Sequence, residues 1–146
     1  EFWIKLSTCE QLLPLDYSLL KTGNEISDQT YTLSKKEVDL YLEAVQDQSK
    51  REFNESGIEL SPPMAIAALS LRGVVNDLQI PGGTLHVGQE MGFKNSVHVG
   101  ETLRCIASLA SNNVRKEWRF MVVNLTVLNS SGHSVMEGKS TIMLPA

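Results

Sequence analysis

Histidine and cysteine are the residue types of this sequence whose side chains most readily act as bases, nucleophiles or metal ligands. The three histidines, His86, His98 and His133, share no spacing that is typical of metal ligands, and each lies beside a turn or on the polar side of a strand-like stretch. The two cysteines, Cys9 and Cys105, are too few for a disulfide framework and are wrongly spaced for a zinc ribbon. We therefore expect exposed histidines, two reduced thiols, no metal site and no cofactor.

Common catalytic motifs and charged patches are missing as well. The sequence contains no Gly-x-Ser-x-Gly, no phosphate-binding glycine-rich loop and no His-Glu-x-x-His. Its 13 basic and 17 acidic residues give a formal net charge of −4, which provides no attraction for a nucleic-acid backbone. The longest wholly apolar run, residues 64–69, is too short to span a membrane, and residues 1–5 do not look like a signal peptide. We expect a cytoplasmic protein with no nucleic-acid and no membrane partner.

The length and the order of patterns point to one domain of mixed structure. A chain of 146 residues is enough for a single domain, and its 42% apolar and 21% charged residues are ordinary for a globular protein. Turn-forming residues are scattered through residues 1–28, which we assign to an N-terminal extension, and residues 29–146 form the domain. The pattern is helical up to about Asp77 and strand-like from Gly82 onward, which favours the α+β class.

Two helices are predicted in the first half of the domain. Ser34 and Glu37 match a capping box, and apolar residues recur every three or four positions behind them, which predicts a helix over residues 35–46. A polar loop separates it from a second helix over residues 62–77, whose start is marked by Ser61 as its cap and by two prolines. This second helix is apolar nearly all round, so it must be enclosed on most sides.

Alternation of apolar and polar residues predicts a sheet in the second half. Its first strand covers residues 85–93, with the odd-numbered residues facing the helix and His86 facing outward. The other expected features are a strand around residues 103–109, a turn at Asn112–Asn113, a strand over 114–128, a hairpin loop over 129–132 and a last strand over 134–144. A small antiparallel sheet that wraps around one apolar helix buries both of them, and this arrangement is the hotdog fold.

Four stretches of the sequence carry a resemblance to a known family. They are residues 44–53, which begin Ala-Val-Gln-Asp, residues 61–65, which read Ser-Pro-Pro-Met-Ala, residues 97–103, and the closing hairpin over residues 131–139. In this order and spacing they resemble the MaoC-like family, whose members are hotdog-fold hydratases and dehydratases that act on acyl thioesters of coenzyme A or acyl carrier protein. The similarity extends from about Tyr31 to Leu144.

The resemblance places an incomplete catalytic motif after the first helix. Active members of the family carry Asp-x-Asn-Pro-x-His, in which the Asp and the His hold the water that adds across an enoyl double bond. The Asp position is Asp47 here, the Asn and Pro positions are Ser49 and Lys50, and the His position is Glu52. A histidine serves as acid or base near neutral pH, whereas two ionised carboxylates repel each other unless one takes up a proton. One catalytic residue is therefore matched and its partner is not.

Three functions are compatible with this incomplete motif. The first is the degenerate, N-terminal or non-catalytic type of MaoC-like hotdog, which shapes the acyl channel while a partner hotdog supplies the Asp and the His. The second is a stand-alone enoyl-CoA hydratase or 3-hydroxyacyl dehydratase in which Asp47 and Glu52 are catalytic. The third is a non-catalytic protein that binds another acyl ligand. We favour the first.

The resemblance also implies where substrate and partner bind. An acyl-CoA or acyl-carrier-protein thioester would bind beside the apolar helix, where Ser61, Pro63 and Met64 form the helix start and free N–H groups attract the carbonyl oxygen. The strand over residues 85–93 is the expected sheet edge, because its glycines let another backbone come close. We expect this edge to pair with a second copy of the chain or with a catalytic hotdog.

Overall fold

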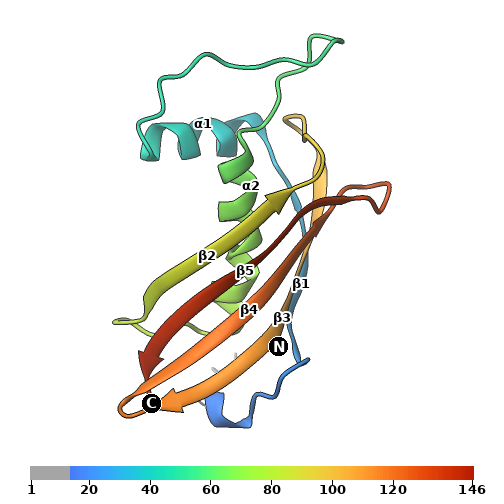
Figure 1. Ribbon diagram of the computed structural model, residues 1–146. Helices are drawn as coiled ribbons and strands as arrows, with labels where there is room; N and C mark the ends of the chain where they lie inside the picture. Colours follow the sequence, from blue (N-terminus) through green and yellow to red (C-terminus); the bar gives the residue numbers. More distant parts are fainter. Residues whose placement is uncertain (1–13) are drawn as a thin grey trace, which may run out of the picture.

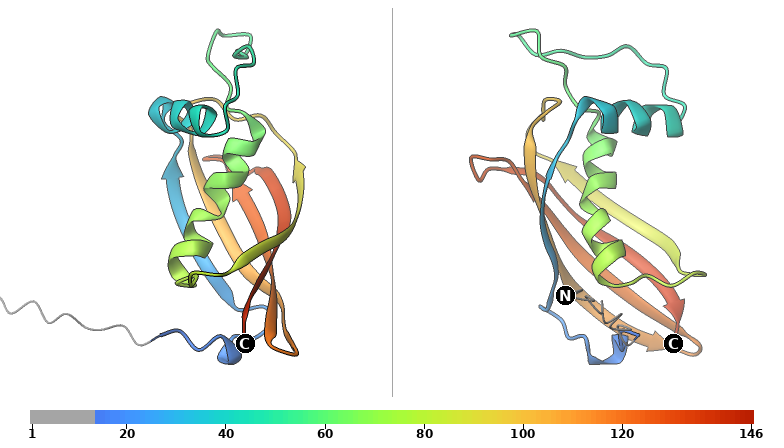
Figure 2. Two further views of the ribbon diagram at one scale, coloured as in Figure 1. Left: turned by 90° about the vertical axis from the view of Figure 1, so that its left-hand side faces the viewer. Right: turned by 180° about the vertical axis from the view of Figure 1, so that it is seen from behind.

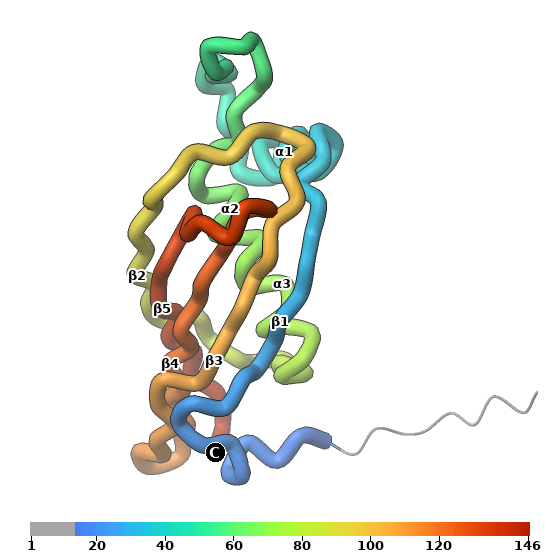
Figure 3. The backbone as a smooth tube through the Cα atoms, turned by 90° about the vertical axis from the view of Figure 1, so that its right-hand side faces the viewer, coloured from blue at the N-terminus to red at the C-terminus, as the bar shows by residue number. Residues whose placement is uncertain are grey.

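Five antiparallel strands form a single curved sheet in the computed structural model, which describes residues 14–146 (Figure 1). The strand order is β1-β3-β4-β5-β2, so β1 and β2 are the two edges (Figure 3). The strands are β1 Glu25–Thr32, β2 Leu85–Phe93, β3 Thr102–Arg115, β4 Trp118–Leu128 and β5 Ser134–Pro145. Buried residues alternate along the three central strands and mark one side of the sheet, which we call the inner face.

The helical elements are the short 3-10 helix η1 Tyr17–Leu19 and the α-helices α1 Lys35–Ala44, α2 Pro63–Ser70 and α3 Arg72–Asp77. Of these, α2 and α3 lie along the inner face, whereas α1 and η1 lie at opposite ends of the sheet (Figure 2). The predicted capping box of α1 is confirmed, because the Ser34 hydroxyl accepts the Glu37 N–H and the Glu37 carboxylate accepts the Ser34 N–H. The helix predicted over residues 62–77 is present as α2 and α3, which are interrupted at Leu71.

The apolar helix is deeply buried where it meets the sheet. Ile66 and Leu69 of α2 and Val74 of α3 keep only 2%, 4% and 2% of their surface exposed. At Gly73 the backbone of α3 lies so close to β1 that a Cβ atom at this position would clash with the Ser27 side chain. The burial of these residues provides the main apolar contact between the helical layer and the sheet.

The opposite side of the same helix is not covered within the described part of the chain. Met64, Ala68 and Val75 lie on this outward side and are exposed. Within residues 14–146 the side of the helix that faces the sheet is buried and the outward side is not, so the expected enclosure is incomplete. Apart from this difference, the arrangement is the predicted α+β hotdog fold.

The prediction for β2 is right in its bounds and partly wrong in which residues face the helix. A bulge after His86 shifts the register, so that His86 pairs with Ile142 and turns toward the inner face. There its Nε2 lies 2.7 Å from the Oγ atom of the buried Ser140. The outward orientation predicted for His86 is wrong, because one extra residue in a strand reverses the side that its neighbours face. Phe93, beyond the bulge, keeps the predicted inward orientation.

The turn predicted at Asn112–Asn113 is also wrong. Both residues lie inside β3, and the chain turns at Lys116, which has a φ of 57°. The Asn112 side chain donates a hydrogen bond to the backbone carbonyl of Tyr17 at 2.7 Å, so its amide serves a tertiary contact instead of a turn. The strand predicted over residues 114–128 accordingly begins only at Trp118.

The segment before β1 is tied to the end of α3. The Tyr17 hydroxyl donates to the carbonyl of Leu78 at 2.7 Å, and β1 itself begins at Glu25. Residues 25–28, which the sequence analysis placed in the N-terminal extension, thus belong to the sheet. Cys9 and residues 1–5 lie outside the described residues.

Cys105 is a free thiol on the inner side of β3. Burial raises its pKa to about 11, so the thiol is protonated at neutral pH and is a poor nucleophile. A search of residues 14–146 for a helix long and apolar enough to cross a membrane finds none.

Replacing Leu69 tests the burial of α2. We expect Leu69→Ala to lower the free energy of unfolding by about 2–5 kcal/mol, because it removes buried methyl groups and leaves a cavity against the sheet. Val75→Ala, on the exposed side of α3, is the matched control and should lower it by less than about 0.5 kcal/mol. Urea unfolding followed by circular dichroism measures both values. Similar losses for the two variants would contradict the one-sided burial of the helix.

Candidate functional site

Most of the candidate residues line one cavity at the start of α2. Asp47, Glu52, Ser61 and Pro63 border a space of about 200 Å³, which we call the helix-start cavity. Its other lining residues are Leu42, Ser49, Lys50, Arg51, Leu60 and Pro62. Met64, the remaining candidate, is the next residue of α2 but is not part of this lining, and 50% of its surface is exposed. The fold thus brings the loop after α1 against the first residues of α2.

Asp47 is held by hydrogen bonds within its own loop. Its N–H donates to the carbonyl of Leu42 at 2.9 Å, and its Oδ1 atom accepts the N–H of Ser49 at 2.8 Å. Hydrogen bonding by Ser49 lowers the pKa of Asp47, although the residue is exposed. A carboxyl group with a lowered pKa is ionised at neutral pH, so Asp47 can accept a proton from a water molecule but cannot act as an acid.

Glu52 lies in the wall between the helix-start cavity and a second cavity. Its backbone carbonyl accepts the N–H of Leu60 at 2.8 Å, which fixes the main chain, whereas the residue as a whole is exposed. The Glu52 side chain therefore lies open to solvent at the border of the two cavities.

An ion-pair network ties the loop over residues 47–60 to α1. Arg51 contacts Asp39 of α1 and Glu59 near the end of the loop, each at 2.7 Å. Lys35 approaches the same two carboxylates at 3.3 Å. The hydrogen bond from Arg51 lowers the pKa of Asp39, so the pairing persists at neutral pH. Sequence reasoning missed this network, because Arg51 and Glu59 meet α1 only in the folded chain, although Lys35 and Asp39 have the i,i+4 spacing.

The start of α2 has no side-chain cap, so the cap predicted at Ser61 is wrong. Pro62 is the N-cap residue, and the Ser61 hydroxyl donates to the Pro62 carbonyl at 3.2 Å instead. The Ser61 N–H donates to the carbonyl of Val97 at 2.7 Å, which fixes the helix start. Pro63 has no N–H, and the Met64 N–H donates to no backbone carbonyl of residues 14–146. A free N–H at a helix start attracts a carbonyl oxygen that gains negative charge.

A second cavity of about 280 Å³ adjoins the first, and we call it the strand-side cavity because it reaches the end of β2. It shares Glu52, Leu60, Ser61 and Pro63 with the helix-start cavity. Its remaining lining residues are Ile66, Phe93, Lys94, Asn95, Ser96 and Val97. Figure 1 shows the end of β2 beside the start of α2. Sequence reasoning missed this wall, because residues 93–97 approach the helix only in the folded chain.

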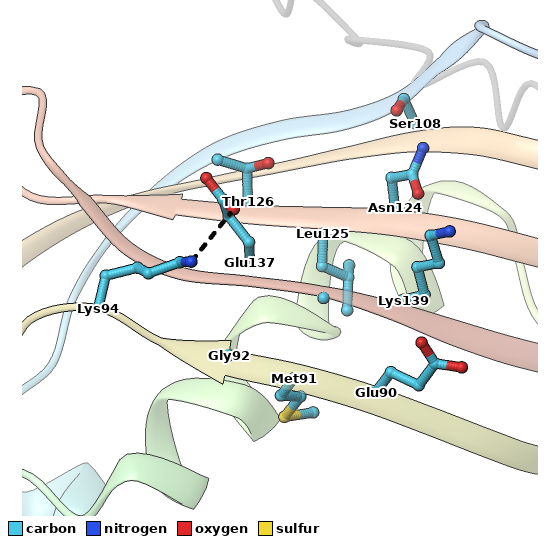
Figure 4. Close-up of a pocket in the computed structure, with 11 residues that line it drawn as sticks. Glu90, Met91, Gly92, Lys94, Ser108, Asn124, Leu125, Thr126, Glu137 and Lys139 are labelled. Carbon is cyan, nitrogen blue, oxygen red and sulfur yellow. Dashed lines mark ion pairs between the residues drawn. The ribbon is translucent and has the colours of Figure 1, made fainter.

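A larger groove, of about 660 Å³, is formed over the strands away from the candidate residues (Figure 4). Its rim carries charges of both signs, and Lys94 and Glu137 form an ion pair there at 3.9 Å. Glu90 and Lys139 are further lining residues, and none of the five candidates is among them. Its open shape and balanced charges offer no reactive group, so we do not assign a site to it.

None of the three histidines lines either cavity at the start of α2. The His86 ring is engaged with Ser140, and the His98 Nδ1 atom lies 3.0 Å from the Glu101 carboxylate. His133 is an exposed residue of the hairpin loop before β5. Residues 14–146 hold no group of three His, Cys, Asp or Glu side chains that could bind a metal ion.

Solved structures of other proteins share this fold. The (R)-hydratase PhaJ1 of Pseudomonas aeruginosa superposes with a TM-score of 0.72 and 20% identity over 88% of this chain and 84% of its own. A chain of the HadBC (3R)-hydroxyacyl-ACP dehydratase complex of Mycobacterium tuberculosis superposes with a TM-score of 0.69 and 18% identity, over 90% of this chain and 100% of its own. A Chloroflexus aurantiacus protein described as a MaoC domain dehydratase superposes with a TM-score of 0.77 and 14% identity, over 95% of this chain but only 42% of its own.

The sequence itself matches one family model. No curated protein is significantly similar to the chain. Residues 21–138 match the model of the FAS1-like dehydratase domain region, and this stretch includes α1, the loop over residues 47–60, both cavities and most of the sheet. The chain therefore belongs to the family of FAS1-like dehydratase domain regions, with the hotdog fold of the MaoC-like hydratases and dehydratases.

Proposed function

We propose that this chain binds an acyl thioester of coenzyme A or acyl carrier protein and is the degenerate half of a hydratase or dehydratase, which shapes the acyl channel for a catalytic hotdog. The observation that carries the proposal is the composition of the helix-start cavity. Asp47 lines this cavity, the position that the resemblance gives to the catalytic histidine holds Glu52, and no histidine is among the lining residues. This composition supports a role in binding with an incomplete acid–base pair.

The missing imidazole matters because hydration of an enoyl thioester needs two proton transfers. A base takes a proton from the attacking water, and an acid delivers one to the carbon next to the carbonyl. Asp47 has the ionisation that the base requires. Glu52 is exposed. The site therefore lacks the imidazole that serves as acid or base near neutral pH.

The features that would hold the substrate do not depend on the missing histidine. The Met64 N–H at the start of α2 is available for the thioester carbonyl oxygen. Ser61 and Pro63 border both cavities, so they lie between a polar entrance with Lys50 and an apolar interior with Ile66. We assign the thioester to this junction and the acyl chain to the strand-side cavity.

The stand-alone hydratase remains the second candidate, and one observation favours it. Asp47 and Glu52 line the same cavity, so a substrate in that cavity would meet both carboxylates. The enzyme would then require that a bound substrate or a partner covers Glu52 and raises its proton affinity. The third candidate, a binding protein for another acyl ligand, has no such observation in its favour.

The proposed pairing with another hotdog follows from the two sheet edges. β1 carries exposed polar and charged residues such as Glu25, Gln29 and Thr30, which discourage pairing with another strand. β2 exposes Leu85 and Val87 and contains two glycines, so it is the edge that another backbone can approach. The structurally similar HadBC dehydratase of Mycobacterium tuberculosis is itself a complex. We propose that β2 pairs with a second copy of this chain or with a catalytic hotdog.

Catalysis by the isolated chain is the first test. We expect no measurable hydration of crotonyl-CoA by the isolated chain, monitored as the loss of its enoyl absorbance, because no histidine lines the helix-start cavity. Saturated butanoyl-CoA should bind saturably in calorimetry. Measurable turnover that Glu52→Gln reduces by about 10²-fold or more would make the stand-alone enzyme the correct function. Glu55→Gln, an exposed glutamate of the same loop, is the matched control and should change neither result.

The use of the β2 edge is the second test. We expect light scattering during gel filtration to give about twice the chain mass of 16.2 kDa at micromolar concentration. Val87→Lys should produce the monomer, because a charge on the edge opposes strand pairing. Thr30→Lys on β1 is the matched control and should leave the dimer intact. A clean monomer of the unaltered chain would exclude the homodimer and leave only the pairing with a catalytic hotdog.

A further inference from the structure

The strand-side cavity is a short pocket, and one of its lining side chains can be substituted without a change to the core. Ile66 and Val97 form its inner end, and both are almost completely buried. Glu52, Lys94 and Asn95 are exposed residues at its rim. An apolar interior with a polar rim suits an apolar chain whose head group stays outside. Because the inner end is closed by core residues, the pocket has a fixed depth.

Phe93 is the lining residue that separates this pocket from the rest of the inner face of β2. It is the last residue of the strand, and its backbone is fixed by pairing with Met136, which is fully buried. Its ring is only partly covered, with 39% of the residue surface exposed. Met91, two positions earlier on the same face, is half-buried against the core. Removal of the Phe93 ring would therefore extend the pocket along β2 toward Met91.

The other walls do not offer such an extension. Ile66 and Val97 belong to the core, so trimming them would leave a closed hole under the sheet and would cost stability. Leu60 and Pro63 separate the strand-side cavity from the helix-start cavity and so border the thioester position. Phe93 alone among the large apolar lining residues stands at the edge of the sheet.

We propose that Phe93 sets the length of the acyl chain that the strand-side cavity accepts, so that the chain binds short and medium linear acyl groups and excludes longer ones. This inference rests on the proposed function, because it requires that the cavity holds the acyl part of a thioester. The volume of the strand-side cavity is about 280 Å³. Chains beyond that size must displace Phe93 or leave the pocket.

The test is a series of binding measurements with saturated thioesters, which cannot be hydrated. Calorimetry with butanoyl-, hexanoyl-, octanoyl-, decanoyl- and dodecanoyl-CoA should show the affinity rising about tenfold for each added pair of carbons until the pocket is full, and then no further. In Phe93→Ala the rise should continue for about two to four more carbons, because the pocket is longer. In Phe93→Trp it should stop earlier, and butanoyl-CoA should bind equally well to all three proteins.

Controls separate this inference from the proposed function. Val114→Ala removes an exposed apolar residue near the end of β3, away from both cavities and from the β2 edge, and should leave the chain-length profile unchanged. Light scattering and circular dichroism establish that each variant keeps its fold and assembly, and Phe93→Leu, with an intermediate shift, serves if Phe93→Ala fails to fold. A profile that is unchanged in the Phe93 variants, or an equal loss at every chain length, overturns the role of Phe93 alone. No saturable binding of any acyl-CoA by the unaltered chain overturns the proposed function.

Discussion

The burial of α2 against the inner face of the sheet is the interaction on which the site depends. Ile66 and Leu69 are almost inaccessible, so the helix cannot shift along or rotate on the sheet without exposing large apolar surface. The position of the helix fixes its first residues, and the hydrogen bond between Ser61 and Val97 holds them next to the end of β2. The free N–H of Met64 and the two cavities follow from this placement.

The loop over residues 47–60 has no regular structure and needs another means of support. Individual ion pairs on a surface contribute little, but Arg51 and Lys35 share the same two carboxylates, Asp39 and Glu59, and so form a network. Because the folded state lowers the pKa of Asp39, its contribution to stability is present above the ordinary aspartate pKa and is lost as the pH falls through the lowered value. At neutral pH the loop is therefore held in place.

Local patterns predicted those parts of the fold that local interactions determine. The capping box of α1, the bounds of β2 and the hairpin loop that contains Gly132, with its φ of 79°, depend on residues close together in the chain. The errors arose where contacts between residues distant in the sequence determine the local structure. The Asn112 amide is satisfied by the segment before β1, and the bulge after His86 depends on pairing with β5. At the site, the sequence indicated the loop and the helix start but not Arg51 or the wall over residues 93–97, which tertiary packing brings there.

If the chain is the proposed degenerate half, its structure accounts for the loss of a catalytic residue without the loss of the cavity. Glu52 is exposed in a loop whose backbone is fixed by the Leu60 N–H and by the neighbouring Arg51, so the side chain at position 52 contributes little to the fold. A change of residue type there alters the chemistry at almost no cost in stability. Ile66 and Val97, by contrast, form the cavity and the core at once, so selection for folding alone preserves the pocket. Under the proposed function, binding of the acyl chain therefore tolerates substitution at position 52 better than the proton transfers beside it do.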